Sequence, residues 1–217
     1  MRQVIKATAA AEMINDGATV LIGGFMGVGS PMRIIDALVA RGARDLTVIA
    51  NDTAMPGVGI GKLVDAGCLK AVVASHIGLN PVTQRKMVAG ELEVTLVPQG
   101  TLIEQIRAGG AGLGGVLTRT GVGTLVEQDK QIVEIRGEKF LLELPIRADF
   151  ALLHAREADY DYNLTYRLTA ANFNPVMAFA GGTVIAEAEE IVPVGVIPPD
   201  AIRTPGVLVN HLVERPH

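Results

Sequence analysis

Residues 16–31 read DGATVLIGGFMGVGSP, and the local structure that they predict indicates the class of fold. Its apolar segment, 18–22, predicts a short strand, and the four glycines within Gly23–Gly29 predict a loop directly after it. Ser30 is a favourable N-cap, and Pro31 is a favourable first residue, for a helix that follows. Because a glycine loop between a strand and a helix N-terminus presents backbone N–H groups, we predict that the loop Gly23–Gly29 faces an anionic ligand.

The rest of the chain alternates apolar segments with helical ones. The apolar runs are continuous, which is typical of strands that helices cover on both faces. We therefore predict an α/β fold, with an open, mostly parallel sheet and helices on both of its faces, as a single domain over residues 1–217. The predicted strands are 18–22, 46–50, 69–74, 92–97, 149–154 and 183–186, with a further candidate at 164–168, and the predicted helices are 7–14, 31–41, 61–66, 81–89 and 101–108.

Glycine becomes frequent after the last predicted helix, for which Thr101 and Glu104 have the spacing of a capping box. Gly109–Gly123 predicts a long loop, and both an active-site loop and a structural one fit this composition. Glycines 110, 112 and 115 match a GxGxxG spacing, but a predicted helix precedes them, whereas a dinucleotide site needs a strand there. Farther on, 131–135 and 140–144 predict a β-hairpin insertion.

The composition argues against several classes of partner. The formal net charge is −4 and no basic run is present, so we expect no nucleic acid partner. No apolar run is long enough to span a bilayer, so we expect no membrane partner. No cluster has metal-ligand spacing, so we expect no metal. The single cysteine, Cys68, predicts a buried structural thiol in a reduced, cytoplasmic compartment.

The glycine loop also belongs to a longer pattern: an Asp-Gly turn, two further residues, three apolar residues, Gly-Gly-Phe, three residues, Gly, one residue and Pro. With this pattern the chain resembles the family I CoA-transferases, above all the α subunits that act on acetate and acetoacetate, and the related 3-oxoacid CoA-transferases. The resemblance covers nearly the whole chain, with further matching segments at 51–53, 75–78, 98–101, 107–115, 172–175 and 204–206.

One segment departs from the family pattern. Family members have a turn that ends in Gly-Asn near Asp161, whereas this chain has Tyr162 before Asn163. Because a tyrosine disfavours a positive φ, we expect this turn to differ from the one in the family.

The resemblance implies a transferase that moves CoA, as a substrate and not as a bound cofactor, from a short-chain acyl-CoA to a free carboxylate. The expected donors are acetyl-CoA, acetoacetyl-CoA or butyryl-CoA, and the expected acceptors are acids such as acetate or acetoacetate. A succinyl-CoA:3-oxoacid or 3-oxoadipate CoA-transferase subunit stays open as an alternative.

The same resemblance implies a division of labour between two chains. In this family the catalytic glutamate lies in a Ser-Glu-Asn-Gly motif of the β subunit, and this chain has no such motif. The resemblance therefore implies that the chain has no catalytic residue of its own and works with a β subunit, in a heterodimer or heterotetramer.

Two neutral side chains, Asn51 and Gln99, follow predicted strands. Ligands of open α/β sheets bind beyond the carboxyl ends of the strands, so these amides are candidates for hydrogen bonds to a substrate carboxylate or thioester oxygen, the alternative being that they cap loops. We interpret Arg33 as either a contact of a CoA phosphate or a solvated helix residue, and His76 as a structural histidine. By resemblance, the CoA contacts are Gly23, Gly24, Phe25, Met26, Gly27, Val28 and Gly29.

Two other classes of function stay open. A nucleotide-dependent dehydrogenase would need a dinucleotide fingerprint between a strand and a helix, and the chain has none in that context. A non-catalytic sensor of phosphorylated metabolites would use the same anion-binding loop.

Overall fold

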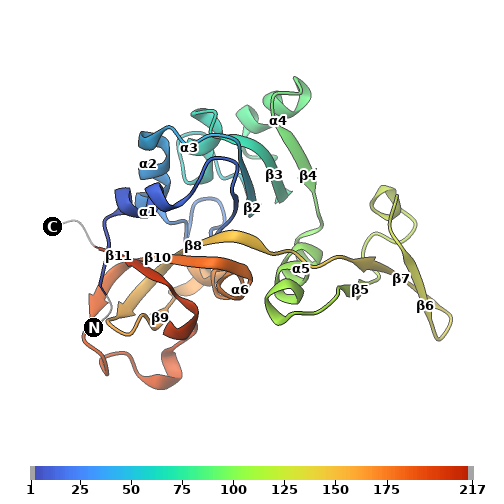
Figure 1. Cartoon of the computed structure of the whole chain (residues 1–217). Coiled ribbons are helices and arrows are strands. Elements are labelled where there is room, and N and C mark those ends of the chain that lie inside the picture. Colours follow the sequence, from blue (N-terminus) through green and yellow to red (C-terminus); the bar gives the residue numbers. More distant parts are fainter. Residues whose placement is uncertain (1–2, 215–217) are drawn as a thin grey trace.

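The main feature of the molecule is an eight-stranded sheet, seen in a computed structural model that describes residues 3–214 (Figure 1). The strand order is β11-β10-β8-β1-β2-β3-β4, and these pairings are parallel, whereas β9 runs antiparallel to β8. The predicted open, mostly parallel sheet is therefore confirmed. Its strands are β1 (Thr19–Ile22), β2 (Leu46–Asp52), β3 (Leu69–His76), β4 (Glu93–Leu96), β8 (Ala148–Asp159), β9 (Leu164–Thr165), β10 (Gly181–Val192) and β11 (His211–Val213).

Helices cover both faces of this sheet, as the continuous apolar strands predict. The buried side chains of α1, α2 and α3 form one core with the sheet, and those of α5 and α6 form a second core on the other face. The helices are α1 (Ala7–Met13), α2 (Met32–Arg41), α3 (Ile60–Asp65), α4 (Pro81–Val88), α5 (Gln99–Ala111) and α6 (Asn174–Ala180). Sequence reasoning did not predict α6, because its seven residues are too few for a helical period to stand out.

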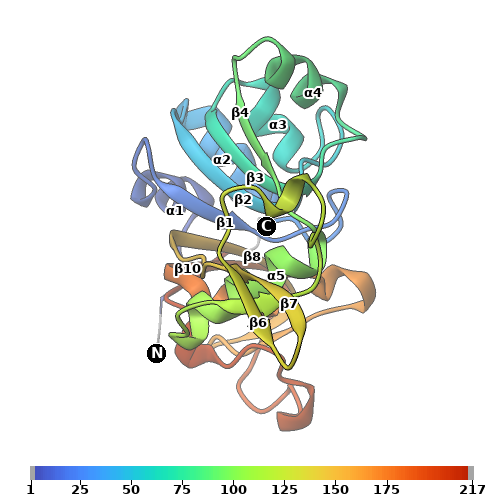
Figure 2. The same cartoon turned by 90° about the vertical axis from the view of Figure 1, so that its right-hand side faces the viewer.

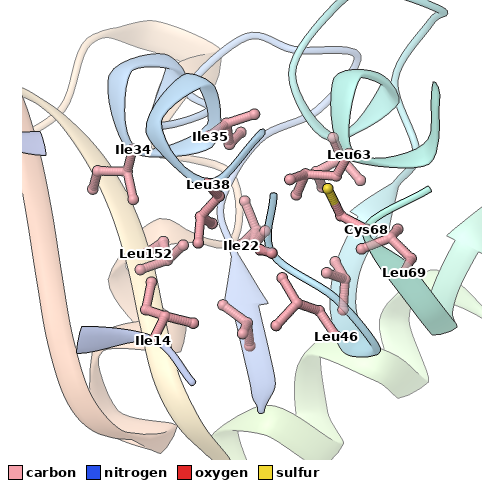
Figure 3. Packing of buried hydrophobic residues seen from close by; sticks show 14 of the residues in the cluster. Ile14, Ile22, Ile34, Ile35, Leu38, Leu46, Leu63, Cys68, Leu69 and Leu152 are labelled. Carbon is pink, nitrogen blue, oxygen red and sulfur yellow. The ribbon is translucent and has the colours of Figure 1, made fainter. Parts of the chain in front are cut away.

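Strand β1 shows how the two cores are filled. Val20 and Ile22 belong to the first core and Leu21 to the second, because successive side chains of a strand point to opposite faces. Figure 3 shows the first core, in which Cys68 lies close to Leu63. Burial raises the pKa of the Cys68 thiol, so this residue is a structural, apolar one, as predicted.

A three-stranded antiparallel sheet projects from the main body as an arm (Figure 1). Its order is β5-β7-β6, from β5 (Val116–Thr118), β6 (Ile132–Ile135) and β7 (Glu138–Glu143). Figure 2 looks along this arm, with β6 and β7 in front of α5. Arg136 and Gly137 connect β6 to β7 with positive φ angles of 53° and 79°, as tight hairpins require. The predicted hairpin insertion is confirmed.

The start of α5 differs from the prediction. The helix begins at Gln99, so Thr101 lies inside its first turn and cannot be its N-cap. Thr101 is buried, and its hydroxyl has no hydrogen-bond partner among residues 3–214. The spacing of Thr101 and Glu104 therefore does not mark a capping box here.

The end of α5 also differs, because the helix continues through Gly109 and Gly110. A β-carbon on Gly109 would clash with the carbonyl oxygen of Ile146, and one on Gly110 would lie 2.5 Å from Cβ of Phe179. These glycines thus serve close packing within a helix, and the helix ends only at Gly112, where φ is 70°. The predicted loop 109–123 is wrong at its first three residues, and it also contains strand β5.

The turn at Tyr162 contains the positive φ angle that its residue type disfavours. Tyr162 adopts a φ of 70°, although tyrosine disfavours such angles. Its ring is 1% exposed, and its hydroxyl donates to the carbonyl of Gln3 over 2.9 Å. Asp159 Oδ1 also accepts hydrogen bonds from the backbone N–H groups of Asp161 and Asn163, each 2.9 Å long. Burial and these bonds hold the conformation that the residue type disfavours.

Strands β8 and β10, of 12 residues each, are twice and three times as long as the predicted segments 149–154 and 183–186. Their outer halves carry charged residues, including Arg156 and Glu189, and so lack the apolar run on which the prediction depended. The candidate strand at 164–168 is confirmed only at Leu164–Thr165.

Candidate functional site

An open cleft of about 450 Å³ lies beyond the carboxyl ends of the central strands. This is the edge at which ligands of open α/β sheets bind. The lining comes from the glycine loop after β1, the end of β2, one face of α5, the segment that leads into α6 and the first turn of α6. The lining residues are Phe25, Asn51, Gln99, Ile103, Arg107, Thr169, Asn172, Phe173 and Val176.

The structure brings the two predicted amides together in this cleft. Gln99 Nε2 donates to Asn51 Oδ1 over 2.7 Å, and the Ser75 hydroxyl donates to the same oxygen over 3.0 Å. Asn51 is buried, whereas Gln99 is exposed. The amide nitrogen of Asn51 donates to no acceptor within residues 3–214, so this donor is available to a bound molecule.

The glycine loop folds into a tight turn at its tip. The backbone groups of Phe25 and Val28 exchange two hydrogen bonds, of 3.0 and 2.9 Å. Between them, Met26 and Gly27 have φ angles of 51° and 86°, as in a type I′ turn. The side chains of Phe25, Met26 and Val28 are exposed, and Phe25 lines the cleft. The loop therefore presents an apolar tip.

The prediction that the loop's N–H groups face outward is largely wrong. Gly23 donates to the carbonyl of Leu152 over 3.0 Å, and Met26 donates to Asp52 Oδ2 over 2.9 Å. The amides of Gly24, Phe25 and Val28 are also bonded within the chain. Among the described residues, only the Gly27 and Gly29 amides of this loop lack an acceptor. Neighbouring segments supply acceptors that the local sequence does not reveal.

The N-terminus of α2 is not a free anion site either. Glu187 Oε2, from the buried part of β10, accepts hydrogen bonds from the backbone N–H groups of Arg33 and Ile34, of 2.9 and 3.1 Å. Pro31 stands at the N-cap position and no side chain caps the helix from there, so Ser30 is not the N-cap. The Glu187 carboxylate already bonds the N–H groups at the positive end of this helix, so we do not expect an anionic ligand to bind there.

Arg33 and His154 surround the same carboxylate. The Arg33 guanidinium donates to the carbonyl of Ala188 over 2.9 Å, and its Nε lies 3.7 Å from Glu187 Oε2, so it is engaged with β10. His154 Nδ1 lies 3.7 Å from Glu187 Oε1, and its Nε2 lies 3.3 Å from Glu189 Oε1. Burial opposes the charge of His154, but the two carboxylates outweigh burial, so the pKa of this histidine is raised. His76, by contrast, is exposed and is not a buried structural histidine.

Two asparagines that hold the glycine loop were not predicted as site residues. Asn172 Oδ1 accepts the N–H of Gly24 over 3.1 Å, and Asn174 Nδ2 donates to the carbonyl of Gly29 over 2.9 Å. Asn174 is fully buried, and its Oδ1 accepts the N–H of His154. The only sequence signal for them is the segment 172–175, which matches the family pattern.

Within residues 3–214, no group of three His, Cys, Asp or Glu side chains is placed to hold a metal ion. Over the same part of the chain, no helix is both long and apolar enough to cross a membrane.

Comparisons with known proteins place the chain in a family. A family model described as "Coenzyme A transferase" matches residues 4–215. The chain is 53% identical over 204 residues to the acetate CoA-transferase subunit alpha of Escherichia coli, covering 94% of this chain and 93% of that protein. It is 48% identical over 214 residues to the acetoacetyl-CoA:acetate/butyrate CoA transferase alpha subunit of Clostridium acetobutylicum, covering 99% and 98%.

A solved structure shows the same fold. The crystal structure of an acyl-CoA transferase from E. coli O157:H7, in a thioester complex with CoA, superposes with a TM-score of 0.86 at 25% sequence identity. The match covers 97% of this chain but only 46% of that chain, so this chain spans about half of the solved one. On the family match and these relatives, the chain belongs to the coenzyme A transferase family.

Proposed function

We propose that this chain is the α subunit of a heteromeric CoA-transferase that moves CoA between a short-chain acyl-CoA and a free acid such as acetate or acetoacetate. One observation carries the division of labour: no carboxylate side chain is among the residues that line the cleft. The nucleophile would be a glutamate of the β subunit. Coenzyme A would be a substrate, and the reaction would need no resident cofactor.

The proposed chemistry is covalent and passes through two intermediates on the partner's glutamate. The glutamate carboxylate attacks the thioester carbonyl, and the carbon–sulfur bond breaks. The products of this step are CoA thiolate, which departs, and an acyl-glutamyl anhydride. The thiolate then attacks the glutamyl carbonyl, which releases the first acid and leaves a glutamyl-CoA thioester. The second acid receives CoA by the reverse steps, so bonds and charges balance.

We assign to the amides of Asn51 and Gln99 the stabilisation of the negative charge that develops on the thioester or carboxylate oxygen. The free amide nitrogen of Asn51 donates to the thioester or carboxylate oxygen, while hydrogen bonds from Gln99 and Ser75 to Asn51 Oδ1 orient the Asn51 side chain. Because both groups are neutral, they stabilise negative charge without forming an ion pair with the glutamate nucleophile.

The apolar walls of the cleft support a short acyl chain as the group transferred. Phe25, Ile103, Phe173 and Val176 line the cleft beside the amide pair. We propose that CoA contacts the loop Gly23–Gly29 through its apolar tip and through the amides of Gly27 and Gly29, and not through a helix N-terminus.

One observation favours a second candidate, a succinyl-CoA:3-oxoacid or 3-oxoadipate CoA-transferase subunit. Arg107 also lines the cleft, and its side chain is exposed, paired with Glu104 over 3.0 Å. A guanidinium there suits the second carboxylate of a dicarboxylic acid. The sensor of phosphorylated metabolites is disfavoured, because Glu187 already occupies the α2 terminus. A cytoplasmic location belongs to the proposal as well, and the single buried cysteine supports it.

The test measures CoA transfer from acetoacetyl-CoA to acetate by this chain alone, by the β subunit alone and by the two together. We expect turnover only with both chains, and turnover by this chain alone would contradict the proposal. Replacing acetate by succinate or 3-oxoadipate in the same assay separates the two candidates, because the first predicts that the monocarboxylic acid is the better acceptor.

A further inference from the structure

One side chain, Asn172, binds both ends of the tip of the glycine loop. Its Oδ1 accepts the N–H of Gly24 over 3.1 Å, and its Nδ2 donates to the carbonyl of Val28 over 3.0 Å. Gly24 precedes the type I′ turn and Val28 is its last residue, so these two bonds hold the turn at both of its ends. We propose that Asn172 is a positioning residue, which fixes the loop tip at the cleft and on which CoA transfer depends; this inference rests on the proposed function.

The same amide ties the tip to another segment of the cleft lining. Asn172 Nδ2 also donates to the carbonyl of Thr169 over 3.0 Å, and both Thr169 and Asn172 line the cleft. Phe25, which lines the cleft from the loop, lies between the two bonded residues Gly24 and Val28. Any displacement of the tip therefore moves one part of the cleft lining relative to another.

Position 172 suits asparagine for two reasons. Its φ is 20°, and asparagine is among the few non-glycine residues that tolerate positive φ. Its short, planar amide offers a donor and an acceptor side by side, which aspartate and alanine do not. The fit is also tight, because a β-carbon on Gly29 would lie 2.9 Å from Asn172 Nδ2.

The amide pair of the cleft is held independently of Asn172. Asn51 is bonded to Gln99 and Ser75, and none of its hydrogen bonds involves Asn172. Without Asn172, the side-chain bond left on the tip is the one from Met26 to Asp52. Loss of Asn172 should therefore displace the loop tip while the groups that bind the acid stay in place.

The experiment compares Asn172→Ala and Asn172→Asp with a control, Asn210→Ala, each assembled with the β subunit. Asn210 also accepts a backbone N–H, that of Val184 over 2.7 Å, but it lies outside the cleft. We expect kcat to fall about 10- to 100-fold in both Asn172 variants, with the KM for the acid unchanged, because a displaced loop misplaces the reacting groups. The control should keep the wild-type kcat.

Hydrogen exchange supplies a readout that does not depend on turnover. Segment 23–28 should exchange faster in both Asn172 variants and at the wild-type rate in Asn210→Ala. Asn172→Asp keeps the acceptor for Gly24 and the tolerance of positive φ, so it decides the question if the alanine variant does not fold.

The outcomes separate the two proposals. If the wild-type pair transfers CoA and Asn172→Asp has wild-type kcat or wild-type exchange at 23–28, the positioning role is overturned and the proposed function stands. If the wild-type pair transfers no CoA, the proposed function fails, and with it the dependence of transfer on Asn172.

Discussion

At the scale of single residues, Gly24 and Gly27 are required by both conformation and space. Their φ angles are 131° and 86°, which only glycine adopts without strain. A β-carbon on Gly24 would clash with the Ser30 hydroxyl, and one on Gly27 would lie 2.6 Å from Val58 Cγ1. A methyl group at either position therefore shifts the loop tip.

We expect Gly24→Ala and Gly27→Ala to fold and to lose most transfer activity. The strain costs about 1–2 kcal/mol per residue, which a domain with about 5–15 kcal/mol of stability tolerates. A misplaced loop tip costs about 10²-fold in turnover. The measurement is the melting temperature and the transfer rate of each variant together with the β subunit.

A matched control is Gly42→Ala. Gly42 has a φ of 71° after α2, but a β-carbon there would meet nothing within 4 Å. This variant carries similar strain and should keep full activity. Wild-type turnover of both loop variants would mean that the loop is only a connection between β1 and α2.

The raised pKa of His154 predicts a pH dependence of stability. An unfolded histidine has a pKa of about 6.5. Glu187 and Glu189 face His154 from β10 and raise its pKa, while Arg33 and Arg156 carry opposing charge nearby. The contribution of His154 to the free energy of unfolding is therefore fully present below about pH 6.5, and it is lost as the pH rises through the pKa of His154 in the folded protein.

Urea unfolding between pH 6 and pH 9 checks this expectation. The free energy of unfolding of the wild type should fall over this range by more than that of His154→Gln. Parallel pH profiles for the two proteins would show that His154 has the same pKa in the folded and unfolded states.

At the scale of elements, α2 depends on a residue that follows it by about 150 positions in the sequence. Glu187 bonds the first amides of the helix and faces Arg33 and His154, so it joins α2 to β8 and β10. The start of α2 is adjacent to the glycine loop, and the β10 contact therefore also fixes the far end of that loop.

We expect Glu187→Gln to lower the free energy of unfolding by about 0.5–2 kcal/mol, because the neutral amide caps the helix less well than the carboxylate. Glu190→Gln is the matched control, since Glu190 belongs to the same strand but is exposed. Urea unfolding at pH 7 measures both variants. Equal stabilities would mean that the Glu187 charge contributes nothing to α2.

The elements also show what the sequence could and could not predict. Apolar periods and turn residues predicted most strands and helices of the sheet, and Asn80 caps α4 as its position before Pro81 indicates. The cap of α2 could not be predicted, because its partner is remote in sequence. Gly109 and Gly110 look like a loop until the neighbours that pack against them are known. Local propensity does not predict a helix boundary where a residue distant in the sequence caps the helix, or where close packing requires a glycine inside it.

At the scale of the whole molecule, several large apolar side chains that adjoin cleft residues in the sequence are exposed. Phe25, Met26 and Val28 extend from the loop tip, and Leu168 stands next to the cleft residue Thr169. Exposed apolar groups next to a cleft that has no nucleophile suit a face that a second subunit covers. The position of Gln99 and Asn51 was predictable from strand ends, whereas this face needed the assembled fold.

We expect Leu168→Glu to weaken association with the β subunit at least about tenfold, the effect of a charge buried in an interface without a partner. Val88→Glu is the control, because Val88 on α4 is 83% exposed, like Leu168 at 84%. Titration calorimetry of each variant with the β subunit measures the effect. Equal affinities for the two variants would place the interface elsewhere.

In the proposed complex, this chain shapes the site while its partner supplies the nucleophile. Incubating the complex of the two chains with acetoacetyl-CoA, in the absence of acceptor acid, and weighing each chain by mass spectrometry tests this claim most directly. We expect a CoA adduct on a glutamate of the β subunit and an unmodified mass for this chain. A CoA adduct on this chain, or steady transfer with no adduct on either chain, would contradict it.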